Sequence, residues 1–517
     1  MNRLAVAISQ AAREHGSRTA LIEGERRLTF QETEALSNQI ASAFLALGLA
    51  KGERVALLLS NSIEFVCLDL ALIKAGLVRV PLNPRLTAAE IEYIVADSGA
   101  AVLLYGAAHQ AAVAAFRGRL PSLRHRIEVD DAAQFEALLQ RGGPEPVAVP
   151  VTDDDPYMIL YTSGTTGKPK GAVTNLRSRW VTLFHVYANE LFVRETDVML
   201  HIASLAHGSG TKVLPFYLKG AANLLMPKFA PAEFCALVQR WRVTATWLVP
   251  TTLSMLLEFN ERERFDLSSL QTITYAGAPI AAERLREAIE VFGPILLQVY
   301  GLSEAPQPDL VLRKEDHSLA NVARLGSAGR PALGVSVRVI GSDGTEVAPG
   351  SGEIGEILLA GEHIMTGYWG RPEATAEVMK DGWFHTGDLA RVDEAGYLYI
   401  VDRAKDLIIS GGFNVYPREV EEVLYQHPCV AEAAVVGIPD PKWGEAVHAV
   451  IALRPEAECT DRDLIAFCRE RLADYKCPKT IRFATDLPKS PNGKILKRQV
   501  RAIYWQGQER QVHGAGG

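Results

Sequence analysis

The sequence predicts an α/β protein with a large N-terminal domain and a small α+β C-terminal domain. Apolar runs of strand length alternate with helical patterns through much of the first 400 residues. After about residue 325 the pattern changes to short alternating strands separated by Gly, Asp and Pro. The chain has 517 residues, which is enough for about three domains and a sizeable core.

The first part of the chain has the clearest alternation of strands and helices. Residues 54–59 and 101–105 are apolar runs of strand length. Ser62 is placed to cap the helix that follows the first run, and Thr87 with Glu90 forms a capping box at the start of the next helix. This order predicts βαβ units, and hence layered parallel sheets with helices on both faces.

A small antiparallel, barrel-like subdomain is expected near the end of the large domain. Its strands are predicted at residues 335–340, 355–359 and 396–401. The last of these strands is rich in Tyr, Ile and Val, and it stops at the charged pair Asp402 and Arg403. This pair is the best candidate for a domain boundary.

The boundary divides the chain into an N-terminal domain of residues 1–401 and a C-terminal domain of residues 402–517. In the second domain, Pro417 suits the first position of a helix whose early turns carry glutamates. A strand and a second helix follow, which makes the unit a compact α+β domain.

Composition excludes several classes of protein. The chain has 54 Lys and Arg against 61 Asp and Glu, a net charge of −7, so it lacks the basic surface typical of nucleic-acid binders. Cys429 stands alone, and Cys459, Cys468 and Cys477 include no CxxC pair, so no zinc site is expected. Reduced thiols favour a cytoplasmic location. No apolar stretch reaches about 18 residues, so no membrane span is expected.

The strongest chemical signal is a loop at residues 161–171 that is rich in Gly, Ser, Thr and Lys. Glycines let backbone N–H groups approach an anion, and hydroxyls add donors, so such a loop can hold phosphate groups. The loop is not a Walker A motif, because Pro169 stands where that motif has its Mg²⁺-binding hydroxyl. The candidate ligands are Thr162, Ser163, Gly164, Thr165, Thr166, Gly167 and Lys170.

Five motifs occur along the chain in this order, at residues 162–171, 300–304, 383–388, 402–406 and 491–494. Together they resemble the adenylate-forming (ANL) superfamily, which includes acyl- and aryl-CoA synthetases, peptide-synthetase adenylation domains and luciferases. The resemblance covers nearly the whole chain. It implies that a carboxylic acid and ATP form an acyl-adenylate with release of pyrophosphate, and that a thiol then displaces AMP.

The resemblance also implies roles for individual residues at the nucleotide. The loop from Thr162 to Lys170 is expected to hold the β- and γ-phosphates. Ser303 replaces the usual Thr and offers its hydroxyl to the α-phosphate, and Glu304 is the expected Mg²⁺ ligand and a catalytic residue. The adenine slot and its motif comprise Gly277, Ala278, Pro279, Tyr300 and Gly301. Asp388 is expected to bind the ribose, assisted by Arg403.

Other implied roles concern catalysis and domain movement. Lys494 is expected to stabilise the charge that develops as the carboxylate attacks the α-phosphate. His207 is assigned to the acyl or thiol path, and Gly411 and Gly412 to the CoA pantetheine tunnel. Asp402 is the expected hinge, because the family swings its small, mobile domain between an adenylating and a thioester-forming pose.

The sequence therefore indicates an acid–thiol ligase that makes acyl-CoA, with ATP, Mg²⁺ and coenzyme A as cofactors. An alternative is a free-standing adenylation enzyme that loads an acyl carrier protein. A silent binding protein is a third reading, against which Lys494, Glu304 and Asp388 argue. A fatty or aromatic monocarboxylic acid is the expected substrate, because no fixed cation for a second carboxylate is apparent. The segment 305–309 is expected to shape the pocket wall. No nucleic-acid partner is expected, and a homodimer is allowed.

Overall fold

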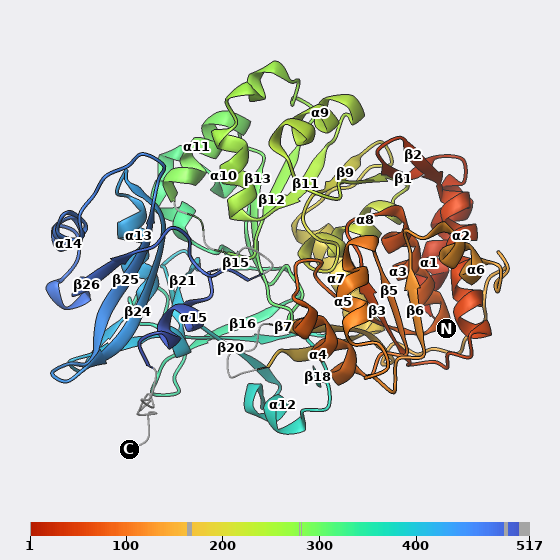
Figure 1. Cartoon of the computed structure of the whole chain (residues 1–517). Coiled ribbons are helices and arrows are strands. Elements are labelled where there is room, and N and C mark those ends of the chain that lie inside the picture. The colour runs from red at the N-terminus through yellow and green to blue at the C-terminus, as the bar shows by residue number, and fades with distance from the viewer. Residues whose placement is uncertain (1, 163–167, 279, 281, 491–494, 506–517) are drawn as a thin grey trace.

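A computed structural model describes residues 2–162, 168–278, 280, 282–490 and 495–505. It has a large domain of layered sheets and helices and a small domain formed by the C-terminal part of the chain (Figure 1). The α/β class, the antiparallel subdomain and the small α+β domain predicted from the sequence are all confirmed.

The first large sheet has seven strands, of which β7, β4, β3, β5 and β6 run parallel. The other two, β8 and β18, extend it antiparallel. In spatial order the strands are β18 (Gly367–Tyr368), β8 (Lys170–Asn175), β7 (Pro156–Thr162), β4 (Val78–Pro81), β3 (Arg54–Leu58), β5 (Val102–Tyr105) and β6 (His125–Glu128).

Strand β3 explains why its sequence is a continuous apolar run. Val55 and Leu57 point into a core shared with the neighbouring helices α2 (Phe30–Ala46) and α3 (Ile63–Ala75). Ala56 and Leu58 point to the opposite face, into a core shared with α4 (Ala88–Ser98) and α5 (Gln110–Ala115). Because both faces of the parallel sheet are covered, the strand needs apolar residues at successive positions.

The second large sheet has nine strands and is parallel from β13 to β1, with antiparallel strands at both ends. In spatial order the strands are β15 (Arg330–Pro331), β14 (Leu310–Leu312), β13 (Leu296–Tyr300), β12 (Thr272–Tyr275), β11 (Ala245–Leu248), β9 (Val198–His201), β10 (Ala222–Leu225), β1 (Thr19–Glu23) and β2 (Arg26–Thr29).

Helices of the large domain cover these sheets. They are α1 (Arg3–His15), α2 (Phe30–Ala46), α3 (Ile63–Ala75), α4 (Ala88–Ser98), α5 (Gln110–Ala115), α6 (Ala132–Leu139), α7 (Leu176–Asn189), α8 (Val213–Tyr217), α9 (Pro231–Trp241), α10 (Pro250–Glu258), α11 (Ala282–Phe292) and α12 (Pro372–Val378).

The helix starts predicted from local sequence are confirmed. The Ser62 hydroxyl accepts the Phe65 N–H at 3.1 Å at the start of α3. At the start of α4, Thr87 accepts the Glu90 N–H at 3.3 Å, and the Glu90 carboxylate accepts the Thr87 N–H at 2.8 Å. These contacts satisfy N–H groups that a helix leaves without internal partners.

A third, antiparallel sheet forms the predicted subdomain. Its strands are β16 (Ser336–Ile340), β17 (Gly355–Ala360), β20 (Trp383–Val392), β19 (Met379–Lys380) and β21 (Leu398–Arg403). Strand β21 starts two residues later than expected from residue 396, because Gly396 has φ +79° and belongs to the preceding turn.

The small domain is a mixed sheet with helices. Its strands are β23 (Phe413–Val415), β22 (Ile408–Ser410), β25 (Gly444–Leu453), β24 (Val430–Asp440) and β26 (Thr480–Phe483), the last paired parallel with β25. Its helices are α13 (Pro417–Tyr425), α14 (Asp461–Arg469) and α15 (Lys497–Ala502). Pro417 occupies the start of α13, as the sequence predicts.

The proposed boundary at Asp402 lies at the end of β21, just before the small domain. An Asp402 carboxylate oxygen accepts the Arg418 N–H at 2.8 Å and so contacts the first turn of α13. The division into residues 1–401 and 402–517 stays a prediction.

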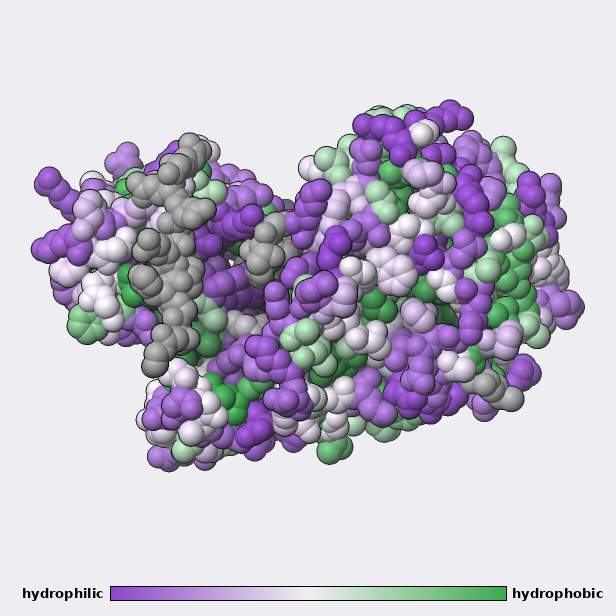
Figure 2. Space-filling model, turned by 90° about the horizontal axis from the view of Figure 1, so that it is seen from below, coloured by the Kyte–Doolittle hydropathy of each residue, from purple (hydrophilic) through white to green (hydrophobic). Residues whose placement is uncertain are grey.

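One face of the molecule is mainly polar, with apolar residues in small groups, and it is hollowed between the small and the large domain (Figure 2). Within the described part of the chain, no helix combines the length and the apolar character that a membrane crossing requires.

Candidate active site

The predicted phosphate loop begins and ends on a β-hairpin. Thr162 at the end of β7 lies opposite Lys170 at the start of β8, and the Thr162 hydroxyl donates to the Lys170 carbonyl at 3.4 Å. The ladder therefore fixes both ends of the loop. The other predicted phosphate ligands, Ser163, Gly164, Thr165, Thr166 and Gly167, lie outside the described residues.

Lys170 and Glu304 are joined through an aromatic residue that the sequence analysis missed. The Lys170 Nζ lies 5.2 Å from the centroid of the Tyr368 ring, and the Tyr368 hydroxyl donates to Glu304 Oε1 at 2.9 Å. Tyr368 reaches this position because β18 pairs with β8. Burial raises the pKa of the Glu304 carboxyl. A strand of only two residues gives little sequence signal, which is why Tyr368 was not predicted.

Three predicted nucleotide residues form one hydrogen-bonded group. Tyr300, at the end of β13, donates its hydroxyl to Asp388 Oδ2 at 2.7 Å. The Arg403 Nε lies 2.9 Å from Asp388 Oδ1. Asp388 and Arg403 meet because they are directly paired residues of β20 and β21. Burial, followed by the Asp388 charge, raises the pKa of Tyr300, so its hydroxyl remains a donor at neutral pH.

The turns after β12 and β13 carry the remaining predicted nucleotide residues. Gly277 has φ +89°, a conformation suited to glycine, and Ala278 follows it. Pro279 lies outside the described residues. At Gly301, a Cβ atom would lie 2.6 Å from the Cβ of Gln307, so a larger residue has no room.

Ser303 and Glu304 lie together in a tight turn. The Leu302 N–H donates to the Ala305 carbonyl at 2.8 Å and closes that turn. The hydroxyl predicted for the α-phosphate and the predicted Mg²⁺ ligand are therefore held on one short segment beside β13.

His207 is half-buried and neutral at pH 7. Burial, followed by the Arg79 charge, lowers the pKa of His207 to about 4. Its Nε2 lies 3.2 Å from the side-chain nitrogen of Asn83, and a neutral Nε2 can accept that N–H. His207 can therefore line a substrate channel as a polar but uncharged side chain.

The segment expected to shape the pocket wall lies against the His207 turn. A Cβ atom on Gly208 would lie 2.6 Å from the Gln307 side-chain nitrogen and 2.6 Å from the Trp247 ring. Only a glycine permits this close packing, which brings residues 305–308 next to His207.

Gly411 and Gly412 form the turn between β22 and β23. Their φ values are +59° and +83°, and the Gly411 N–H donates to the Trp443 carbonyl at 2.8 Å. A Cβ atom on Gly411 would lie 2.6 Å from the Trp443 ring. The glycines are thus required by the turn itself, and their assignment to a CoA tunnel stays a prediction.

Lys494 lies outside the described residues. The chain on either side of it belongs to the small domain, where Lys489 and Ile495 form an antiparallel bridge and the Leu496 N–H donates to the Pro488 carbonyl at 2.8 Å. The described residues on either side of the predicted lysine segment therefore lie next to each other in the small domain.

A cavity of about 410 Å³ lies between the two domains. Tyr399 and Arg391 line it from the large domain, and Tyr416, Arg418 and Lys476 line it from the small domain. None of the described residues that line it is a predicted nucleotide ligand, so this cavity belongs to the domain junction.

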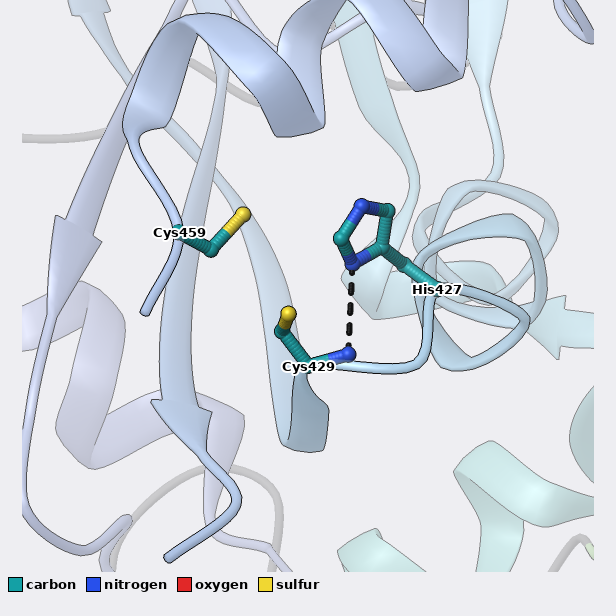
Figure 3. A group of neighbouring side chains, drawn as sticks. All are labelled: His427, Cys429 and Cys459. Atoms are coloured by element: carbon teal, nitrogen blue, oxygen red, sulfur yellow. Dashed lines mark hydrogen bonds between the residues drawn. The ribbon is translucent and has the colours of Figure 1, made fainter. Parts of the chain in front are cut away.

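Three potential soft-metal ligands meet in the small domain. One ligand atom each of His427, Cys429 and Cys459 lies within 4.8 Å of the others (Figure 3). The expectation that Cys429 stands alone is therefore wrong, because two segments distant in sequence bring it beside Cys459. However, His427 Nδ1 already accepts the Cys429 N–H at 3.3 Å. Burial raises the pKa of the Cys459 thiol to about 11, which disfavours the thiolate a metal needs.

Comparison with known proteins identifies the family of the chain. Residues 8–369 match the family described as AMP-binding enzyme, and residues 419–494 match the AMP-binding enzyme C-terminal domain. This chain belongs to the AMP-binding enzyme family. The resemblance to adenylate-forming enzymes is thereby confirmed.

Relatives of this AMP-binding enzyme carry aromatic and fatty acyl names. It is 40% identical over 489 residues to feruloyl-CoA synthase of Amycolatopsis sp, covering 94% of this chain and 96% of the relative. It is 36% identical over 507 residues to fatty acid–[acyl-carrier-protein] ligase ScoC of Streptomyces coeruleorubidus, covering 95% and 94%. The solved Mycobacterium tuberculosis fatty acyl CoA synthetase is 34% identical, with a TM-score of 0.78 and coverage of 98% of this chain and 99% of that one.

The AMP-binding enzyme is an ATP-dependent, AMP-forming acid–CoA ligase. In the first half-reaction a carboxylate attacks the α-phosphate of ATP, which gives acyl-adenylate and pyrophosphate. In the second half-reaction the CoA thiol attacks the acyl carbon, which gives acyl-CoA and AMP.

Proposed function

We propose that this ligase activates a fatty or aromatic monocarboxylic acid and transfers the acyl group to CoA. The observation that supports this most is the Tyr300–Asp388–Arg403 group beside Glu304. One carboxylate oxygen of Asp388 accepts the Tyr300 hydroxyl, and the other lies against the Arg403 guanidinium. Glu304 accepts a hydrogen bond from Tyr368. Fixed polar groups of this kind can orient a nucleotide without rearranging during the reaction.

The nucleotide is proposed to lie with its ribose at Asp388 and its phosphates toward Lys170. In this arrangement Tyr300 keeps Asp388 oriented, and Arg403 balances the Asp388 charge. Ser303 donates its hydroxyl to the α-phosphate, and the loop from Thr162 to Lys170 surrounds the β- and γ-phosphates. The adenine binds between the residues of the 277–279 segment and the Tyr300 ring, on which it stacks.

Glu304 is proposed to hold Mg²⁺. Glu304 suits Mg²⁺ because its carboxylate is a hard oxygen ligand. It is linked through Tyr368 to Lys170, which supplies a positive charge at the C-terminal end of the phosphate loop. Mg²⁺ bound there would neutralise phosphate charge while the carboxylate attacks. The protein's part is to keep Glu304 oriented through the Tyr368 hydroxyl.

Lys494 is proposed to stabilise the transition state of adenylation from the small domain. Movement about Asp402 would then remove it and bring the second domain into the pose for CoA attack, with Gly411 and Gly412 beside pantetheine. Neutral His207 would line the path between the acyl and thiol groups.

CoA is proposed as the acceptor in preference to a carrier protein, in a cytoplasmic setting where ATP and CoA are both available. Carrier-protein loading is the second candidate, because one relative bears that name. A homodimer is a further possibility, which size-exclusion chromatography with light scattering decides.

The test offers the purified enzyme ATP, Mg²⁺ and a panel of octanoate, palmitate, cinnamate and benzoate. Each acid is paired with CoA or with a phosphopantetheinylated acyl carrier protein, and AMP and thioester are measured together. We expect equal amounts of AMP and acyl-CoA. Acylation of the carrier protein alone would favour the second candidate, and no acid-dependent AMP with either acceptor would overturn the proposal.

A further inference from the structure

A small polar cavity lies between the seven-stranded sheet and helix α7. It measures about 20 Å³, which is room for roughly one water-sized atom. Arg79 of β4, Thr174 of β8 and Arg179 of α7 line it, together with Gly210 and Pro306. The sequence analysis found no fixed cation for a second polar group of the substrate, because these arginines lie far apart in the chain.

The two arginines differ in how their charges are compensated. Arg79 is paired with Asp69 at 3.0 Å. Arg179 has no ion pair with any described carboxylate, and it donates only two long hydrogen bonds, to the carbonyls of Thr211 at 3.3 Å and Gly210 at 3.4 Å. Their exposed fractions are 5% for Arg79 and 7% for Arg179. A buried charge without a counter-ion is unfavourable, so Arg179 favours an anionic or strongly accepting partner.

Three of the residues that line this cavity each carry a buried polar atom without a hydrogen-bond partner among the described residues. These atoms are the Nε atoms of Arg79 and Arg179 and the Thr174 hydroxyl oxygen. Buried polar atoms normally have partners, so three around one cavity indicate a missing oxygen atom. The two Nε–H groups can donate to that oxygen, and Thr174 can accept a proton from it or donate to it.

The cavity borders the region assigned to the acyl group. Gly210 belongs to the turn that follows His207, and its N–H donates to the His207 carbonyl at 3.0 Å. Pro306 lies two residues after Glu304, in the segment that packs against that turn. The unpartnered polar groups of Arg79, Thr174 and Arg179 therefore border the segment 305–308, on the side of α7.

We propose that this cavity is a polar subsite at the far end of the acyl pocket, which binds an oxygen substituent of the acid remote from the activated carboxylate. The substrates are then hydroxy or oxo fatty acids, or phenolic aryl acids. The inference rests on the proposed function and narrows its substrate class. Arg179 selects the substituent, and Thr174 completes its hydrogen bonding.

The test compares matched acids that differ only in the remote oxygen. The pairs are octanoate against ω-hydroxyoctanoate, and cinnamate against para-hydroxycinnamate. For each pair we measure the ratio of kcat/KM values for acyl-CoA formation. The wild type is expected to prefer an oxygen-bearing acid by about tenfold or more in at least one series, as sites built to hydrogen-bond a substituent do.

Variants then assign the preference to the cavity. Arg179→Met, which has a similar length and no charge, is expected to reduce the ratio to about one, and Thr174→Val to reduce it in part. Arg179→Lys restores the charge without Nε and is expected to give an intermediate ratio. Arg177→Met is the matched control, because Arg177 is a partly exposed neighbour on α7 whose ion-pair partners are Asp154 and Glu362. Melting temperatures are recorded for each variant.

The outcomes separate the inference from the proposed function. Acyl-CoA formation without an oxygen preference in the wild type would overturn the polar subsite alone. A preference as large as that of the wild type in both Arg179→Lys and Thr174→Val, even if Arg179→Met does not fold, would also overturn it and leave the cavity as a site for a structural water. No acyl-CoA from any acid would overturn the proposed function and the subsite with it.

Discussion

Asp388 and Arg403 are directly opposed residues of β20 and β21, with Arg403 Nε 2.9 Å from Asp388 Oδ1. This pairing brings together two motifs that the sequence separates. The Tyr300 hydroxyl completes the group from a different sheet. The candidate nucleotide site is therefore assembled where the antiparallel subdomain meets the end of β13.

Tyr300→Phe is expected to raise the KM for ATP by about tenfold. The change keeps the ring but removes a hydrogen bond to a carboxylate, and such bonds contribute about 1.5–3 kcal/mol. Steady-state kinetics with varied ATP give the value. Tyr399→Phe is the matched control, since its hydroxyl donates to Asp393 at 3.2 Å on a neighbouring turn. Equal KM changes in both variants would argue against a nucleotide role for Tyr300.

Glu304→Gln is expected to lose Mg²⁺-dependent adenylation while it folds normally. The amide oxygen can still accept the Tyr368 hydroxyl, but the charge that binds the metal is gone. The measurement is acid-dependent pyrophosphate exchange over a range of Mg²⁺ concentrations. Tyr368→Phe keeps the carboxylate and should have the smaller effect. Wild-type exchange by Glu304→Gln at limiting Mg²⁺ would remove Glu304 from the metal site.

Asp402→Pro is expected to slow one half-reaction more than the other. Proline fixes φ near about −65° and so restricts a residue expected to change conformation between poses. Asp402→Asn is the control, because its side-chain oxygen can still accept the Arg418 N–H while the backbone remains free. Adenylation and thioester formation are measured separately. A uniform loss in both steps would contradict a hinge at this position.

The free energy of unfolding is expected to fall as the pH falls from about 6.5 to 4. Burial lowers the pKa of His185, His201, His207, His317 and His448 to about 4. Between the unfolded value near 6.5 and this folded value, only the unfolded chain binds the proton, so stability rises with pH.

A variant isolates the histidine contribution, because buried carboxyls such as Glu421, whose pKa burial raises, act in the opposite direction. His201 is fully buried between Ser209 and Asn223. His201→Gln is expected to lower stability at pH 7 but to flatten the pH slope by up to about 1.4 kcal/mol per pH unit. Urea unfolding at several pH values provides the slopes. An unchanged slope would show that His201 is protonated in the folded protein.

Local patterns predict helix starts but not the contacts between distant segments. Ser62 and Thr87 were identified because a cap and its partner lie three residues apart. Arg79 and Arg179 were missed, because their meeting depends on how α7 packs on the sheet that contains β4.

The same limit explains the other differences at the site. Tyr368 was missed because its two-residue strand gains meaning only when it pairs with β8. The proximity of Cys429 and Cys459 likewise depends on how two segments of the small domain that are distant in sequence lie together. The motif resemblance, in contrast, predicts nucleotide roles for Asp388 and Arg403 without knowledge of the strand pairing that brings them together.

The structure decides which nearby basic residue is the better control for Lys494. Lys497 is close in sequence, but its Nζ lies 2.9 Å from Glu421 and 4.0 Å from Asp402 at the domain junction. Replacing it would disturb that junction. Arg498 is exposed on α15 and is the better basic control.

The half-reactions of Lys494→Ala test the central claim most directly, with Arg498→Ala beside it. Adenylation is followed by acid-dependent pyrophosphate exchange, and thioester formation by conversion of supplied acyl-adenylate with CoA. The two-pose account predicts that Lys494→Ala slows adenylation by about two orders of magnitude or more, as loss of one fixed electrostatic donor does. It predicts that thioester formation stays largely intact and that Arg498→Ala affects neither step. Equal impairment of both half-reactions by Lys494→Ala, or of neither, would contradict the account.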